Sequence, residues 1–104
     1  MSPDENGYPT KQEIKQVKTY SGHVQSKNSR NMDVPRLIEL LQGIWYMPDW
    51  GIQKEGRHLE LHTAGWSGNE DIIKALQGSM FWLFYWQKSE RGGHYYFELP
   101  EITP

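Results

Sequence analysis

Residues 58–100, HLELHTAGWSGNEDIIKALQGSMFWLFYWQKSERGGHYYFELP, decide the fold of this chain. The first five residues alternate between polar and apolar side chains, which is typical of a half-buried strand with both leucines facing the core. A helix is expected next, because Ser67 and Glu70 form a capping box, with Asn69 as a competing cap. Gly78 is then suited to ending that helix.

The end of this stretch predicts an aromatic β-hairpin. Residues 80–87 are apolar on both faces and are expected to form a strand, 88–93 the turn, and 94–99 the returning strand. Because strand–helix–strand connections are right-handed and join parallel strands, strands 58–63 and 80–87 are expected to run parallel. The prediction is a small mixed three-stranded sheet, in which the loop at 64–69 and the turn leave the same end.

The first half of the chain predicts two helices. A capping box opens a short helix over 10–20. Asp33 begins a second helix with apolar residues at helical spacing, and this helix must end before Pro48. The predicted fold class is therefore α+β, with two N-terminal helices before the strand, helix and hairpin. The predicted domain organisation is a flexible tail over 1–9 and a single domain over 10–104.

The composition limits both size and chemistry. With 104 residues, the chain is long enough for one domain with a core and too short for two. A net charge of −2 argues against binding by bulk neutralisation of phosphates. The absence of cysteine excludes disulfides and thiolate ligands. No apolar run approaches membrane-spanning length and nothing resembles a signal peptide, so we expect a soluble intracellular protein without membrane contact and without a cofactor.

Four short motifs stand out along the chain: YPT at 8–10, MPDWG at 47–51, TAGWSGNE at 63–70 and SERGGHY at 89–95. A chain with these motifs is similar to a family of small proteins encoded by bacteriophages and prophages. The family pattern has a second glycine where this chain has Ala64. No activity is established for that family, so the resemblance implies a phage or prophage origin and a place in the bacterial cytoplasm, but no mechanism.

The segment Gly65–Asn69 leads from the predicted strand into the predicted helix. Glycines allow a backbone to approach a ligand closely, and N–H groups at a helix start can bind an anion. The segment lacks the lysine of a phosphate-binding loop, and a plain capped turn explains the same residues. A small-ligand or phosphate-binding domain that uses this segment is one alternative hypothesis.

Three residues, His58, Glu60 and His62, share one face of the predicted strand, and His94 is a conceivable fourth ligand. Two imidazoles and a carboxylate suit a metal ion. However, residues two apart on a strand are separated by about 7 Å, so three in succession cannot reach one ion without distortion. A polar face exposed to solvent is the stronger interpretation, and no metal site is predicted.

A catalytic arrangement can be written with Ser67 as nucleophile, His62 or His94 as base and Glu70 as the orienting acid. No nucleophile-elbow spacing accompanies these residues, and the serine is already expected to cap a helix. The sequence therefore favours a protein without enzymatic activity.

The segment Arg91–Phe97 partly matches the aromatic strand of RNA-recognition modules. Aromatic side chains on a sheet face can stack on bases, but a small domain needs the same side chains in its core. Binding of single-stranded nucleic acid by aromatic stacking is the second alternative hypothesis.

Protein binding is the hypothesis that the sequence favours. Trp and Arg side chains are common interface anchors, and here they occur in loops expected at one end of the sheet, where ligand sites form. We expect the partner to be a host or phage protein. The predicted binding residues are Trp50, Trp66, Ser67, Asn69, Arg91 and His94.

Overall fold

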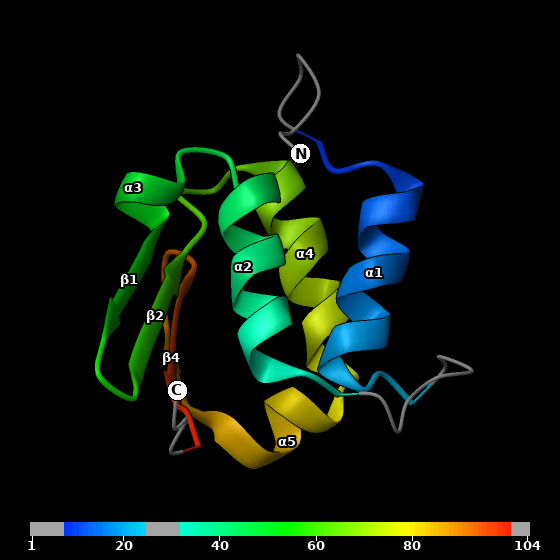
Figure 1. The fold of residues 1–104 in the computed structure, drawn as a ribbon. Helices are drawn as coiled ribbons and strands as arrows, with labels where there is room; N and C mark the ends of the chain where they lie inside the picture. Colours follow the sequence, from blue (N-terminus) through cyan, green and yellow to red (C-terminus); the bar gives the residue numbers. More distant parts are fainter. Residues whose placement is uncertain (1–7, 25–31, 101–104) are drawn as a thin grey trace.

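A computed structural model describes residues 8–24 and 32–100, so that of the expected tail only residues 8 and 9 are described. Helices cover one face of a four-stranded antiparallel sheet, which is an α+β architecture (Figure 1). None of the helices in the described residues has the length and apolar content needed to cross a membrane. The elements in chain order are α1 (Lys11–Ser21), α2 (Val34–Ile44), α3 (Pro48–Gly51), β1 (Ile52–Glu55), β2 (His58–His62), α4 (Ser67–Gln77), α5 (Met80–Tyr85), β3 (Trp86–Glu90) and β4 (His94–Glu98).

The two predicted N-terminal helices are confirmed. α1 opens on the expected capping box, in which the N–H of Glu13 donates to Thr10 Oγ1 at 3.1 Å and the N–H of Thr10 donates to Glu13 Oε1 at 2.8 Å. α2 opens on Asp33, whose carboxylate accepts from the N–H of Arg36. Each such cap satisfies a backbone donor at a helix start and stabilises the helix by about 1 kcal/mol.

The predicted strand at 80–87 is wrong, because its first six residues form helix α5 and only then does β3 begin. Ser79 caps the helix by accepting from the N–H of Trp82 at 3.1 Å. The helix buries Phe81 and partly buries Trp82 and Tyr85, which recur at helical spacing, and leaves Leu83 exposed. An uninterrupted apolar run carries no period of its own, so it fits a short helix as well as a strand.

The sheet also differs from the predicted one. Its order is β1-β2-β4-β3, and every neighbouring pair is antiparallel. The predicted mixed sheet is therefore wrong in having three strands and in containing two neighbouring strands that are parallel. The added strand, β1, joins β2 through a turn at Gly56. The predicted direction is right, however. β2 and β3 run the same way on either side of β4, so their C-terminal ends lie at one end of the sheet.

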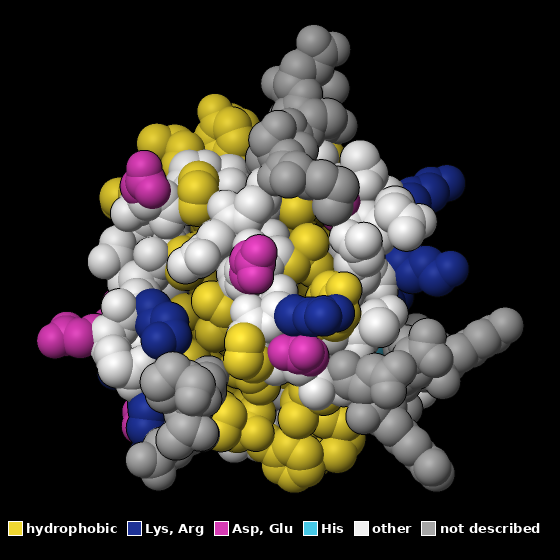
Figure 2. All heavy atoms as spheres, in the orientation of Figure 1, with side chains coloured by type: hydrophobic (Ala, Val, Ile, Leu, Met, Phe, Trp, Pro, Cys, Tyr) yellow, Lys and Arg dark blue, Asp and Glu magenta, His cyan; other side chains and the backbone are white. Residues whose placement is uncertain are grey.

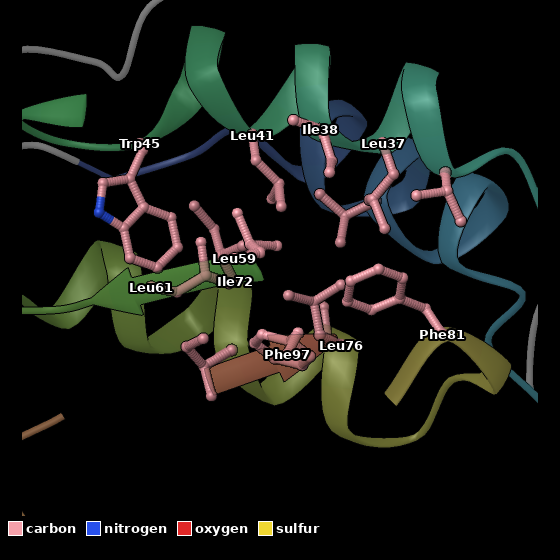
Figure 3. Packing of buried hydrophobic residues seen from close by; sticks show 14 of the residues in the cluster. Leu37, Ile38, Leu41, Trp45, Leu59, Leu61, Ile72, Leu76, Phe81 and Phe97 are labelled. Carbon is pink, nitrogen blue, oxygen red and sulfur yellow. The ribbon is translucent and has the colours of Figure 1, made fainter. Parts of the chain in front are cut away.

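The core lies between the inner face of the sheet and the helices (Figure 3). Leu59 and Leu61 of β2 and Phe97 of β4 are fully buried there, and each contributes about 1.5–3 kcal/mol by leaving water. Trp45 closes one side of this cluster, and its indole N–H donates to the carbonyl of His62 at 3.2 Å. Because the core uses the inner face, the polar residues of each strand remain on an open outer face.

In the described part of the chain, β1 and β3 are the edges of the sheet. All of β3 is exposed, and it follows directly on α5, where Leu83 and Phe84 are 71% and 57% exposed. Figure 2 shows hydrophobic side chains gathered at this lower end of the molecule, over α5. This apolar surface lies at the opposite end of the molecule from α3 (Figure 1).

Candidate functional site

A chain of hydrogen bonds runs along the open face of the sheet. Glu60 binds both histidines of its own strand, with Oε2 at 2.7 Å from His58 Nε2 and Oε1 at 3.0 Å from His62 Nε2. The other ring nitrogen of His62 faces β4, where its Nδ1 lies 2.7 Å from the Nδ1 of His94. The strand register places these two histidines directly opposite each other.

These contacts determine where protons sit. The hydrogen bond from His58 holds the pKa of Glu60 below its usual value, and the bond from His62 acts in the same direction against the opposing effect of burial. Glu60 is therefore an ionised acceptor, and the Nε2 of His62 carries a proton toward it. Between the two Nδ1 atoms only one proton fits, so His62 and His94 cannot both donate there.

The weak metal candidates do not form a metal site. Within residues 8–24 and 32–100, no three His, Asp or Glu side chains come together in a way that could hold a metal ion. His58, Glu60 and His62 bind one another in a line instead of converging on one point. This agrees with the strand spacing, which separates alternate residues.

The open face is hollowed beside this chain of hydrogen bonds, with a volume of about 530 Å³. Trp50 projects from α3 at its border, 49% exposed, with its ring 5.8 Å from that of His62. We refer to this depression as the hollow. Its lining residues come from α3, β1, β2 and β4, and they are Trp50, Gln53, Lys54, Glu55, His58, Glu60, His62 and His94.

The loop after β2 and the turn before β4 meet at one end of the sheet, as the sequence predicts. The N–H of Thr63 donates to the carbonyl of Gly93 at 2.9 Å. Gly93 has a φ of 83°, and a Cβ there would collide with Thr63 Oγ1, so both backbone conformation and contact require glycine. This junction brings Trp66 to the same end as Arg91 and His94, and the three residues with Trp50 form what we call the rim.

Trp66 is held in place by a stacked partner. Its ring lies 4.0 Å from that of Tyr46, with an interplanar angle of 3°. Asn69 fixes Tyr46 in turn, because its Oδ1 accepts from the N–H of Tyr46 at 2.8 Å and its Nδ2 donates to the carbonyl of Tyr46 at 3.1 Å. Trp66 nevertheless remains 38% exposed.

Two predicted binding residues have different roles from those expected. Asn69 is 2% exposed and supports the rim through Tyr46, so its side chain is not offered to a ligand. Ser67 is exposed as the first residue of α4, and Trp66 occupies the cap position without a side-chain cap bond. The expected capping by Ser67 or Asn69 is therefore wrong. The buried amide of Asn69 is used across the fold instead.

The aromatic residues of β4 divide between the two faces of the sheet. Phe97 is fully buried and Tyr95 packs against the core. Tyr96 lies on the open face, with Lys88 Nζ 4.7 Å from its ring centroid. A hydrogen bond to Glu90, reinforced by burial and by the charge of that carboxylate, raises the pKa of Tyr96 to about 12.

Sequence reasoning misses Tyr46 and the β1 side of the hollow. Tyr46 follows the end of a helix, and no local pattern links it to Asn69, which lies 23 residues later. Gln53 and Glu55 lie on β1, whose single apolar residue, Ile52, is too weak a signal for a strand.

Comparisons with protein-family models, with curated proteins and with solved structures find no match to this chain. The candidate site therefore rests on its own geometry.

Proposed function

We propose that this chain is a non-enzymatic binding protein that engages a host or phage protein through the rim of Trp50, Trp66, Arg91 and His94. With the resemblance described above, we further propose that it is a phage or prophage accessory protein acting in the bacterial cytoplasm.

The observation that carries the proposal is the combination of exposure and rigidity at the rim. Trp50 and Trp66 are 49% and 38% exposed, yet one projects from a helix that starts with proline and the other is stacked on Tyr46. An exposed aromatic ring already held in one position loses little freedom on binding, which is how large interface anchors achieve affinity.

Hydrolysis by the Ser67 arrangement has less support. Both ring nitrogens of His62 are hydrogen-bonded, one to Glu60 and one to His94. Neither nitrogen is therefore bonded to Ser67, as a base that activates a nucleophile would be. Base stacking along β4 also has less support, because Phe97 and Tyr95 face the core and Tyr96 is bordered by carboxylates.

The test is partner capture with matched surface variants. The double substitution Trp50→Ala with Trp66→Ala should abolish capture of a protein that the wild-type chain retains from a bacterial lysate. The control is Leu83→Ala with Phe84→Ala, which removes two still more exposed apolar side chains at the opposite end of the molecule. Retention of the partner by the rim variant, or its loss from both variants, contradicts the proposal.

A further inference from the structure

Each strand of the sheet places one glutamate on the open face. Cross-strand partners share a face, and both Glu55 and Glu98 lie opposite His58, while Glu90 lies opposite His94. Together with the central carboxylate of β2, the set is Glu55, Glu60, Glu90 and Glu98.

Three cations near this face have known contacts. Arg57 Nε lies 3.7 Å from Glu98 Oε1, and Lys88 lies over the ring of Tyr96. Lys54 lines the hollow, with its Nζ donating to the carbonyl of Gly56 at 2.9 Å. Among the lining residues of the hollow, two carboxylates on β1 and β2 thus face one cation, so the hollow is acidic when its histidines are neutral.

Two of these carboxylates are held in the ionised state. His58 donates to Glu60, and the phenol of Tyr96 does the same for Glu90, and each hydrogen bond lowers the pKa of the glutamate it reaches. Both carboxylates are therefore ionised at neutral pH.

We propose that the hollow accepts an arginine-containing segment of the protein partner, with the guanidinium between the indole of Trp50 and the carboxylates of Glu55 and Glu60. This rests on the proposed function and adds the chemistry of the partner to it. A planar guanidinium stacks on an indole while donating in parallel to a carboxylate, which an ammonium cannot do. A volume of about 530 Å³ lies in the range of pockets that hold a small ligand, so it has room for an arginine side chain.

Direct titration of the full chain with labelled peptides tests this chemistry. The ligand is a short fluorescein-labelled glycine–serine peptide carrying two arginines, followed by fluorescence anisotropy. The matched peptides carry two lysines or two glutamates, and a short single-stranded DNA of equal length is added as a further competitor. The arginine peptide should bind at least about tenfold more tightly than the glutamate peptide, with the lysine peptide in between.

The protein variants separate the hollow from overall charge. Glu55→Gln with Glu60→Gln should weaken the arginine peptide about tenfold. Glu39→Gln with Glu70→Gln removes the same charge from exposed positions on α2 and α4 and should change affinity by less than about twofold. The first variant could fail to fold because it weakens the hydrogen bonds of Glu60. In that case Glu55→Gln with Trp50→Leu tests the same hollow and leaves those hydrogen bonds in place.

Three results overturn the inference: equal weakening by both glutamine pairs, binding of the glutamate peptide or the DNA as tightly as the arginine peptide, or no binding of the arginine peptide. None of them decides the proposed function, which stands or falls on partner capture by the rim variants. If the rim variant loses its partner and the arginine peptide does not bind, the proposed function stands and the arginine inference is wrong.

Discussion

The imidazole rings of His62 and His94 meet through their Nδ1 atoms, 2.7 Å apart, and so share a single proton between β2 and β4. This is a cross-strand bond between two neighbouring residues that both line the hollow. It depends on one ring donating and the other accepting.

Replacing His94 with alanine should lower the free energy of unfolding by about 1 kcal/mol at pH 7.5, because the bond to His62 is lost. The loss should be absent when His94→Ala is made in a His62→Ala background, because the bond is then already missing. Urea unfolding of the single and double variants measures this. His58→Ala is the control: its partner is Glu60, so it leaves the bond between His62 and His94 in place.

Asn69→Ala should lower the free energy of unfolding by about 2–3 kcal/mol, because it leaves both the N–H and the carbonyl of Tyr46 without their side-chain partner near the core. Ser67→Ala, on an exposed neighbour in the same helix turn, should change stability by less than about 0.5 kcal/mol. Thermal or urea unfolding of the two variants decides between this role and a ligand-binding role for the asparagine. Equal effects would contradict the assignment.

Ala64→Gly should stabilise the fold by about 1 kcal/mol, since Ala64 has a φ of 55°, a left-handed conformation that disfavours a Cβ. The reverse change at the next residue, Gly65→Ala, should destabilise by about 1 kcal/mol. Gly65 has a φ of 70° and open space where a Cβ would stand, so the penalty comes from the backbone alone. Melting temperatures that move the same way for both variants would show that another effect dominates.

Tyr96 should ionise near pH 12 in the folded protein, and its phenolate absorbance gives the measurement. Because the folded pKa lies above the ordinary value of about 10, the stabilisation is fully present below pH 10 and is lost as the pH rises toward 12. Glu90→Gln should return the pKa toward its ordinary value, since the bond to that carboxylate is the largest cause of the shift. An unchanged titration in this variant would remove Glu90 as the cause.

The parts of the fold that the sequence predicts are those with local signals. Capping residues such as Thr10 and Asp33 determine where helices begin, and the alternation of β2 determines its two faces. The run Met80–Trp86 does not alternate, and although Ser79 caps it as a helix, its aromatic residues suit a buried helix and a buried strand alike. Its division at Trp86 depends on Phe81 packing into a core built by distant segments.

The candidate site divides in the same way. The meeting of the Thr63 loop with the Gly93 turn follows from strand direction, which the sequence predicts. The bond between His62 and His94 requires the register of strands 32 residues apart, and the role of Asn69 requires its contact with Tyr46. Neither contact is encoded in spacing along the chain, so candidate site residues can be named from the sequence while their partners cannot.

The exposed edge of β3 has a consequence for the free protein in solution. An unpaired strand edge is a template for pairing with another chain, and here it continues from the apolar surface of α5. Lys88 and Glu90 stand on that strand as charged gatekeepers against such stacking. We therefore expect these two residues of the open face to limit association between molecules, and substituting both with apolar residues should increase aggregation with concentration, measured by light scattering.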